Sequence, residues 1–423
     1  MSFKETELGK IPEKWDLVRL EDIADVLDPH PSHRAPNEVE NGFPFAGIGD
    51  INEYGEINIE KARKVSENII LNHIENYFID KNSIGYGRVG TVGKVVKLKE
   101  RSKYKYALSP TLAVINGNDK VDNDYLYALL RSKIFFNQVK KFMTGSTRPS
   151  IGIKALRDIM VPYPSKNEQI LIGKIISTLD EKIEVNNQIN KTLENIAQTI
   201  FKQWFVDFEF PNGAGEPYKS SGGEMVESEL GMIPKGWEIF EFREFFKFVK
   251  GKKPKIIEEN KFEGSYKYLT IDVLNNNSFL YCTNEKVIEV TSQNVLMVMD
   301  GASSGVTFFG QSGIVASTLA KLDLYNKKIS NQFLYILMKY YEEDIKSHTT
   351  GSAIPHTDKE YVYRLKIALP KDDIITKLFN DIVYETSESI IKRSNESKIL
   401  KELRDSVLPK LMSGEIRVPI EEN

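Results

Sequence analysis

The chain has 423 residues, which is enough for two or three domains with sizeable cores. Apolar residues make up 41% and charged residues 28%, as in ordinary globular proteins, and no stretch approaches the roughly 18 apolar residues of a membrane span. The N-terminal residues lack the apolar core of a secretion signal, so we expect a cytoplasmic protein. A single cysteine, Cys282, excludes an internal disulfide and a cysteine-based zinc site, and the scattered histidines argue against a metal cluster: His30, His33, His73, His348 and His356.

The net charge of −3 hides a strong asymmetry along the chain. Between Lys81 and Arg157 there are 16 Lys and Arg against 4 Asp and Glu, a local net charge of +12. The densest part, which also contains Tyr104 and Tyr106, is formed by Lys94, Lys97, Lys99, Arg101, Lys103 and Lys105. A shorter basic run consists of Lys247, Lys250, Lys252, Lys253 and Lys255. Clustered cations suit a polyanion such as nucleic acid, although a solvated strand face would give the same pattern.

Two segments of the chain return later in the same order, which indicates an internal repeat. Glu5–Trp15 returns as Glu227–Trp237, an offset of 222, and Thr144-Gly145-Ser146 returns as Thr350-Gly351-Ser352, an offset of 206. The chain is therefore two copies of one module, and the first copy has 16 extra residues. Similar borders around different interiors predict a common framework that carries two different binding surfaces. An old duplication kept only for stability would not by itself explain the different interiors.

Each copy ends in a segment with helical periodicity. In the first copy, Ser165–Glu168 has the S-x-x-E form of a capping box directly after Pro164. The residues that follow at alternating steps of four and three form a coiled-coil seam: Ile172, Ile176, Leu179, Ile183, Asn186, Asn190, Leu193, Ala197, Ile200 and Trp204. A flanking stripe contains Ile175, Ile189 and Ile196. The second copy has a weaker seam formed by Ile375, Leu378, Ile382, Ile399, Leu403, Val407 and Leu411, and Gly414 ends it after a kink at Pro409.

These patterns predict an α+β protein with two mixed modules and two long helices. We expect the first module at residues 1–164, the first long helix at 165–210, a linker at 211–228, the second module at 229–370, the second long helix at 371–414 and a tail at 415–423. The simplest arrangement pairs the two helices with each other. The alternative is that each helix pairs with a partner chain.

Catalytic motifs do not emerge from the sequence. Gly85–Gly90 matches the dinucleotide pattern G-x-G-x-x-G, but the next residues read as a strand instead of the helix that this motif needs. The sequence contains no P-loop, no H-E-x-x-H and no Pro-Pro pair of an adenine methyltransferase. Asp300–Gly305 is more typical of a β-turn than of a nucleophile loop, and His356 is more typical of a polar loop residue than of a catalytic base. We therefore expect a protein that binds and does not catalyse.

Several motifs frame both copies. They are Leu8–Pro12 with Trp15 and its copy at 230–237, the two Thr-Gly-Ser loops, the helix start Asn167–Gln169, the helix end Trp204–Glu209 and the tail Leu403–Ile416. Together they cover the whole chain, which resembles the specificity subunit of a type I restriction-modification system. Two places depart from the family pattern: Lys371–Asp373 replaces the helix start in the second copy, and Ala353-Ile354 replaces Thr147-Arg148.

The resemblance implies two target-recognition domains, related by a pseudo-twofold repeat and separated by two long antiparallel helices. Each domain would read one half of a split sequence in double-stranded DNA, and the helices would set the spacer. Two modification subunits are expected to dock and methylate adenine at N6 with S-adenosylmethionine after flipping the base. A restriction subunit, a motor-nuclease, would bind ATP and Mg²⁺. The chain itself would be non-catalytic and without a cofactor.

The candidate site residues form two groups. For DNA we expect contacts from Arg88, Lys94, Lys97, Lys99, Arg101, Lys103, Lys105, Thr144, Arg148, Lys250, Lys252, Lys253, Lys255, Ser303, Ser304 and Thr350. Lysines would mostly contact phosphates, whereas Arg88 or Arg148 could read guanine. For helix pairing or subunit docking we expect Ile172, Ile176, Leu179, Ile183, Asn186, Asn190, Leu193, Ile200, Trp204, Leu403, Val407 and Leu411.

Several alternatives remain open at this point. Turn formation explains Ser303, Ser304 and the Thr-Gly-Ser loops at least as well as DNA contact does. A coiled-coil scaffold would explain the helices but not the basic block. A self-sufficient DNA methyltransferase or nuclease would explain the basic block but not the missing motifs.

Overall fold

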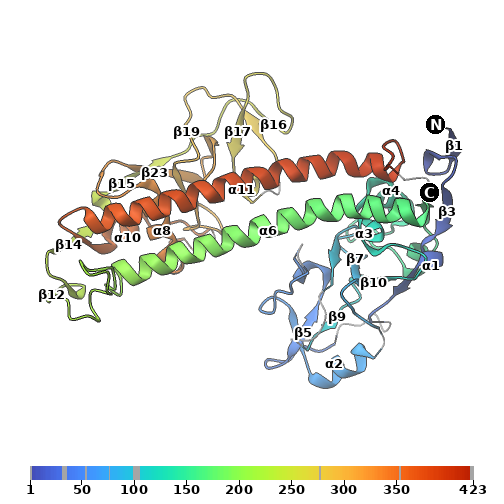
Figure 1. The fold of residues 1–423 in the computed structure, drawn as a ribbon, viewed down its shortest axis with the longest axis horizontal. Helices are drawn as coiled ribbons and strands as arrows, with labels where there is room; N and C mark the ends of the chain where they lie inside the picture. Colours follow the sequence, from blue (N-terminus) through green and yellow to red (C-terminus); the bar gives the residue numbers. More distant parts are fainter. Residues whose placement is uncertain are drawn as a thin grey trace. The chain divides into compact units, whose positions relative to one another are not determined.

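The computed structural model describes residues 2–30, 36–52, 55–75, 77–98, 105–275, 278–351 and 354–419. The chain divides into two compact units. The first unit contains Met1–Val185 and Glu396–Asn423, and the second contains Asn186–Asn395. Each unit therefore holds one copy of the repeat together with one part of each long helix, α6 (Lys166–Phe205) and α11 (Ile374–Met412) (Figure 1). The mixed α+β class with two long helices is confirmed.

In the first unit, strands and short helices alternate. A four-stranded sheet has the order β4-β10-β7-β8, a three-stranded sheet has the order β6-β5-β9, and the pairs β1-β2 and β11-β3 complete the set. The elements are β1 Phe3–Thr6, β2 Gly9–Pro12, β3 Asp16–Arg19, α1 Leu20–Ile23, β4 Ala24–Leu27, β5 Phe43–Ala46, β6 Arg63–Val65, α2 Glu67–Ile74, β7 Ile84–Gly87, β8 Val95–Lys97, β9 Ala107–Leu108, β10 Leu112–Gly117, α3 Asn123–Arg131, α4 Lys133–Phe142, α5 Ile153–Arg157 and β11 Met160–Tyr163.

The second unit repeats most of this topology. Its four-stranded sheet β15-β23-β20-β21 corresponds to β4-β10-β7-β8, and the pairs β12-β13 and β14-β24 correspond to β1-β2 and β3-β11. A five-stranded sheet, β16-β18-β17-β22-β19, stands where the first unit has three strands. The elements are β12 Met225–Ser228, β13 Gly231–Pro234, β14 Trp237–Glu241, β15 Phe246–Lys250, β16 Ile257–Glu258, β17 Tyr266–Leu269, α7 Ile271–Leu274, β18 Tyr281–Cys282, β19 Glu289–Val290, β20 Val295–Val298, β21 Thr307–Phe308, β22 Gly313–Val315, β23 Leu319–Leu324, α8 Asn331–Tyr340, α9 Glu342–Ser347, α10 Lys359–Arg364 and β24 Lys366–Pro370.

Local sequence explains where the repeated helices begin. Asp122 accepts a hydrogen bond from the backbone of Tyr125 at 2.9 Å and so caps α3. Ser330 accepts the corresponding bond from Phe333 at 3.0 Å and caps α8. These side chains satisfy amide groups that the first helical turn leaves unpaired.

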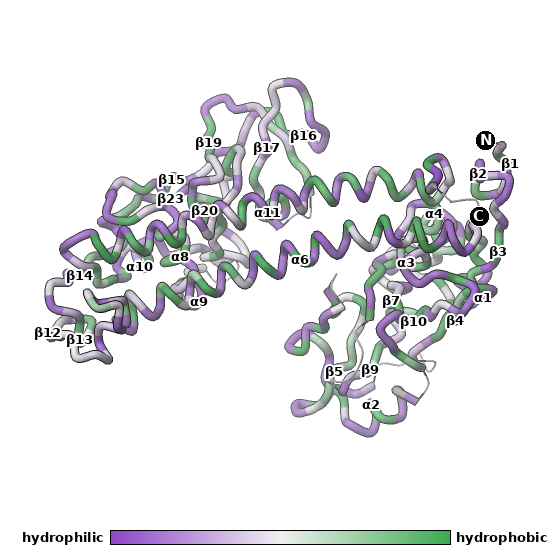
Figure 2. Tube along the Cα trace, viewed as in Figure 1, coloured by the Kyte–Doolittle hydropathy of each residue, from purple (hydrophilic) through white to green (hydrophobic). Residues whose placement is uncertain are grey.

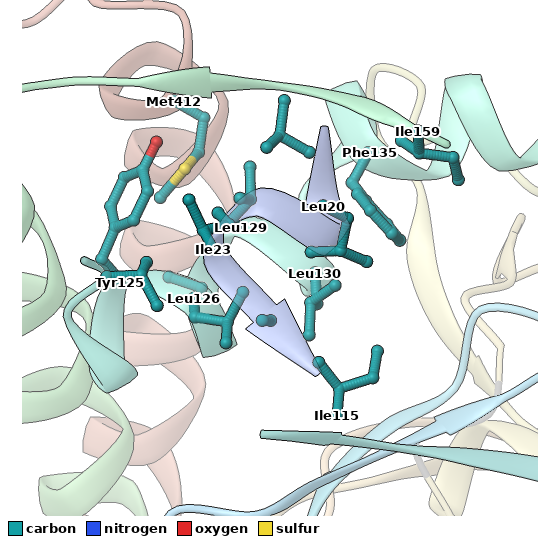
Figure 3. Packing of buried hydrophobic residues seen from close by; sticks show 14 of the residues in the cluster. Leu20, Ile23, Ile115, Tyr125, Leu126, Leu129, Leu130, Phe135, Ile159 and Met412 are labelled. Atoms are coloured by element: carbon teal, nitrogen blue, oxygen red, sulfur yellow. The ribbon is translucent and has the colours of Figure 1, made fainter. Parts of the chain in front are cut away.

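The core of the first unit joins both ends of its chain. Tyr125, Leu126 and Leu129 of α3 pack with Trp15 and with Met412 of α11 in one buried cluster. Figure 3 shows Met412 close to Tyr125, whose hydroxyl also donates to Pro162 O at 2.8 Å. The C-terminal segment is therefore part of the first module's core.

The core of the second unit is rich in aromatic residues. Phe379 of α11 lies with its ring centroid 5.1 Å from that of Phe205 and 5.2 Å from that of Phe333. Phe201 of α6 joins the same cluster, and Trp237 packs against Phe205. Aromatic rings of this size supply much of the burial that holds helix to module.

In the first unit, Ile172 and Ile176 of α6 pack in one buried cluster with Leu411 of α11, and in the second unit Phe201 of α6 packs in one buried cluster with Phe379 of α11. Polar and apolar residues alternate along both helices (Figure 2). On α6, the seam residues Ile172, Ile176, Ile183 and Asn186 are buried, and partial burial is found for Leu179, Asn190, Leu193, Ile200 and Trp204. Asn190 donates to Ser394 Oγ of α11 at 3.1 Å in the second unit.

The residues of α11 that are buried differ in part from the seam that the sequence predicts for this helix. Leu411 is buried and Val407 is partly buried, but Leu403 is 47% exposed and Leu378 is 43% exposed. Besides Leu411, the buried positions of α11 are Thr376, Phe379, Val383, Ser387, Ser397, Leu408 and Met412. Thr376, Ser387 and Ser397 are buried although they are polar, so the spacing of large aliphatic residues alone does not identify this stripe.

Candidate nucleic-acid interface

The two Thr-Gly-Ser loops are closed in the same way. In the first module, Thr144 and Ser150 exchange two backbone hydrogen bonds, with N···O distances of 2.9 and 2.8 Å. In the second, Thr350 and His356 exchange the corresponding bonds at 2.9 and 2.7 Å. Both loops are therefore held by main-chain bonds that do not depend on the side chains at their ends.

A glycine turns each loop. Gly145 has φ of 83° and Gly351 has φ of 91°, a left-handed region that favours glycine. A Cβ atom would lie 2.7 Å from Arg148 O in the first loop and 2.4 Å from Ile354 O in the second. The glycine is therefore required twice for the same steric reason, which places Arg148 and Ile354 at the same point of the two loops.

Each loop is also tied to the segment after the central strand, β7 or β20. Gly90 N donates to Pro149 O at 2.8 Å, and Gly301 N donates to Pro355 O at 2.9 Å. Two residues further along each loop, Ile151 N donates to Arg88 O at 2.9 Å, and Thr357 N donates to Met299 O at 2.9 Å. We call this set of bonds, between 88–90 and 144–151 and between 299–301 and 350–357, the loop frame.

The side chains on the loop frame differ between the modules. In the second, His356 Nδ1 lies 2.8 Å from Asp300 Oδ1, and Lys250 Nζ lies 3.0 Å from Asp300 Oδ2. Partial burial opposes ionisation of Asp300, but the hydrogen bonds from His356 and Lys250 outweigh it and hold the pKa of the carboxyl below its usual value. In the first module the corresponding positions carry Val89 and Ser150.

Arg88, an expected guanine reader, points into the first module. Its side chain is 7% exposed, and its Nη2 lies 2.6 Å from Asp28 Oδ2. The corresponding residue in the second module is Met299, which is also buried. A DNA contact from Arg88 would first have to break a buried ion pair, which is costly.

The basic block of the first module is engaged with its own chain where the structure describes it. Lys94 Nζ donates to Ile48 O at 3.0 Å and Ile51 O at 2.5 Å. Lys97 pairs with Asp124 at 3.1 Å, and Lys105 pairs with Glu67 at 2.5 Å, but both side chains remain about half exposed. Lys99, Arg101 and Lys103 lie outside the described residues.

The remaining candidates fall into exposed and buried groups. Exposed residues are Thr144, Arg148, Thr350, Lys252, Lys253 and Lys255, and Lys255 Nζ lies 3.0 Å from Glu285. Ser303 is partly buried and accepts a backbone bond from Val306 within a turn. Ser304 is buried, and its Oγ lies 2.8 Å from Gly301 O and 2.9 Å from Pro355 O. These contacts give Ser304 a turn-forming role in the loop frame.

We also searched the described residues for a cavity, a metal site and a membrane-spanning helix. A cavity of about 530 Å³ in the first unit is lined by Tyr127, Arg131, Asp180 and Arg404, among others, and lies away from the loop. Among the residues that the structure describes, no three His, Cys, Asp or Glu side chains gather as metal ligands would. Within the same residues, no helix combines the length and apolar character needed to cross a membrane.

Comparison with known proteins places these features in a family. A family model described as "Type I restriction modification DNA specificity domain" matches residues 12–195 and again 234–397. The MjaIX type I restriction enzyme specificity subunit of Methanocaldococcus jannaschii is 27% identical over 98% of this chain and 96% of its own length. The HindI specificity subunit of Haemophilus influenzae is 26% identical over 74% of this chain and 81% of its own length.

A solved structure has the same fold. The crystal structure of the S subunit of a type I restriction-modification system from M. genitalium aligns with a TM-score of 0.55 at 18% identity, over 95% of this chain and 96% of that one. Both matched segments carry one loop frame each, so the repeat seen in the sequence and in the backbone bonds is the repeat of the family domain. The chain belongs to the type I restriction-modification DNA specificity family, as a specificity subunit that is itself non-catalytic.

Proposed function

We propose that this chain reads a bipartite DNA sequence, with one half-site assigned to each module. The observation that carries this proposal is that one loop frame, with matching backbone bonds, occurs twice and presents different side chains. A framework kept twice with unlike surfaces is what two different half-sites need. Membership of the specificity family supports the role in DNA target recognition.

The DNA contacts are proposed from exposure and charge. In the first module these are Lys97, Lys105, Thr144 and Arg148, and in the second Lys252, Lys253, Lys255 and Thr350. Because exposed lysines reach phosphates without reading bases, most would position the protein on the duplex. Lys99, Arg101 and Lys103 stay in the proposal on their charge alone.

We also propose a complex with two modification subunits and a restriction subunit, in the cytoplasm. An apolar stripe on α6 is open to such partners, because Ile175, Ile189 and Ile196 are 39%, 36% and 47% exposed. Exposed aliphatic residues along a helix are typical of a docking surface. In this complex S-adenosylmethionine would belong to the modification subunits, and ATP with Mg²⁺ to the restriction subunit.

Genome-wide adenine methylation tests the proposal. The cognate modification subunit is expressed in a methylation-free host with or without this chain, and methylated adenines are mapped by long-read sequencing. We expect a bipartite motif with a fixed gap only when the chain is present. Methylation that is absent in both strains, or identical in both, would contradict the proposal and favour a coiled-coil scaffold.

A further inference from the structure

The loop frame holds different side chains at three corresponding positions. We propose that these positions determine which bases each module accepts, and the three pairs are Val89 and Asp300, Arg148 and Ile354, and Ser150 and His356. This inference rests on the proposed function, since it names the residues by which the two modules would distinguish their half-sites.

The frame itself does not require any of these side chains. Its bonds run between main-chain atoms, and its turn depends on Gly145 or Gly351. Arg148 is exposed, and Ile354 is 57% exposed, so neither contributes much to a core. The backbone bonds fix where these positions lie but do not determine which side chain stands there. Such positions are suited to recognising a ligand that differs between the modules.

In the second module, Asp300 orients the imidazole of His356. Because an ionised carboxylate can only accept, the ring nitrogen that faces it, Nδ1 at 2.8 Å, carries the proton. In the tautomer with the proton on Nδ1 alone, Nε2 is an acceptor. The ring lies against Gly351, where an added Cβ would come within 3.1 Å of Cδ2, and the side chain is 49% exposed. Lys250 balances the second oxygen of Asp300 at 3.0 Å.

These groups predict a chemical preference. An acceptor such as Nε2 matches the amino group of adenine N6 or cytosine N4 on the major-groove edge. The exposed side chain of Ile354 matches the methyl group of thymine. Because an A·T pair presents both an amino donor and a methyl group, we infer that the second module reads A·T pairs at this point.

The first module predicts a different preference at the same point of its loop. Arg148 has a guanidinium with paired donors, which matches O6 and N7 of guanine. Ser150 can donate or accept and selects less strongly. The first half-site is therefore expected to contain a G·C pair where the second has an A·T pair.

This inference is tested by measuring how strongly the complex discriminates between bases. The complex contains the full chain and its modification subunit. Once the wild-type motif is known, duplexes with one substituted base pair are compared with the cognate duplex. The quantity measured is the Kd for the substituted duplex divided by the Kd for the cognate duplex. For His356→Ala, which removes the acceptor, and for Ile354→Arg, we expect this ratio to fall about tenfold or more at a position of the second half-site. The ratios for the first half-site should not change.

A matched control is available in the same module. His348 is also 49% exposed, and its Nδ1 lies 3.5 Å from Asp344 Oδ1, but it stacks on Tyr361 outside the loop frame. His348→Ala should leave every ratio unchanged.

The outcomes separate the inference from the function on which it rests. Unchanged ratios for both loop variants, or weaker binding by an equal factor on all duplexes, would overturn the inference while the proposed function stands. A wild-type complex without any bipartite motif would overturn the proposed function itself. Thermal unfolding of each variant confirms that the ratios are measured on folded protein.

Discussion

The indole Nε1 of Trp15 donates a hydrogen bond to Oε1 of Glu168, at a distance of 3.2 Å. This bond joins the first repeat motif of the chain to the start of α6, where Glu168 also completes the capping box with Ser165. Arg417 pairs with the same carboxylate from the C-terminal segment. Three segments far apart in the sequence therefore meet at one buried side chain.

Replacing this carboxylate should destabilise the first unit. Glu168→Ala would remove the carboxylate half of the capping box of α6 and leave Arg417 and Trp15 without their carboxylate partner, at a cost of about 3 kcal/mol. Urea unfolding measures the free energy. Glu5→Gln, which affects an ion pair with Lys10 between side chains that are 73% and 72% exposed, is the control and should leave the midpoint unchanged. Equal effects of the two changes would contradict the role of Glu168.

Asp180 should make the first unit sensitive to acid. Burial opposes its ionisation, but Arg131 and Arg404 outweigh burial and hold its pKa below the usual value of 3.8. The stabilisation is therefore complete above about pH 3.8 and is lost as the pH falls through the lower pKa of the folded state.

We expect Asp180→Asn to be less stable than the wild type at pH 7, because both arginines lose their charged partner. The difference in unfolding free energy should shrink only below the usual carboxyl pKa. Unfolding of both proteins is followed between pH 7 and 3, with the neighbouring exposed Glu181→Gln as the control. A difference that already disappears above pH 5 would exclude the ion pairs as its cause.

Phe379 and Leu378 test the position of the buried stripe on α11. Phe379 is fully buried among aromatic rings, whereas Leu378 is 43% exposed. Phe379→Ala should cost about 3–5 kcal/mol of unfolding free energy, because it leaves a cavity in the second unit. Leu378→Ala should cost far less. The opposite order would restore the seam expected from the sequence.

The basic block should contribute to DNA affinity without selecting sequence. Changing Lys97, Lys99 and Lys103 together to alanine should weaken binding to all duplexes and flatten its dependence on salt, by about 0.9 in the log–log slope for each lost phosphate contact. Titrations at several salt concentrations measure this slope. Lys202→Ala serves as a control because Lys202 pairs with Asp207 at the end of α6. An unchanged slope would remove the block from the interface.

Much of the fold could be predicted from the sequence because a repeat and helical spacing are one-dimensional signals. The repeat borders and the burial of Ile172 and Ile176 follow directly from such patterns. The stripe on α11 did not, since Thr376 and Ser387 are buried by the packing of neighbouring elements and not by their own hydrophobicity. The domain boundaries stay a prediction, and β12 lies within the range expected to be linker.

The candidate site was harder to predict, because a charged side chain is available to a ligand only if the fold does not pair it with another residue. Arg88 resembles an exposed DNA reader in sequence, and only the fold brings Asp28 to its guanidinium. His356 resembles an ordinary loop residue, yet it is paired with Asp300, which lies 56 positions earlier in the chain. An alignment of the two copies would have placed His356 opposite Ser150 and marked the position as different.

The division of the chain has a consequence for the order of folding during synthesis. The core of the first unit includes Leu408, Leu411 and Met412, and Gly414 packs against Pro12 and Trp15. The second unit is continuous and can close as soon as residues 186–395 have left the ribosome. The module that is made first is therefore completed last, and a chain that ends before Leu408 lacks part of the first unit's core while the second unit still has all of its residues.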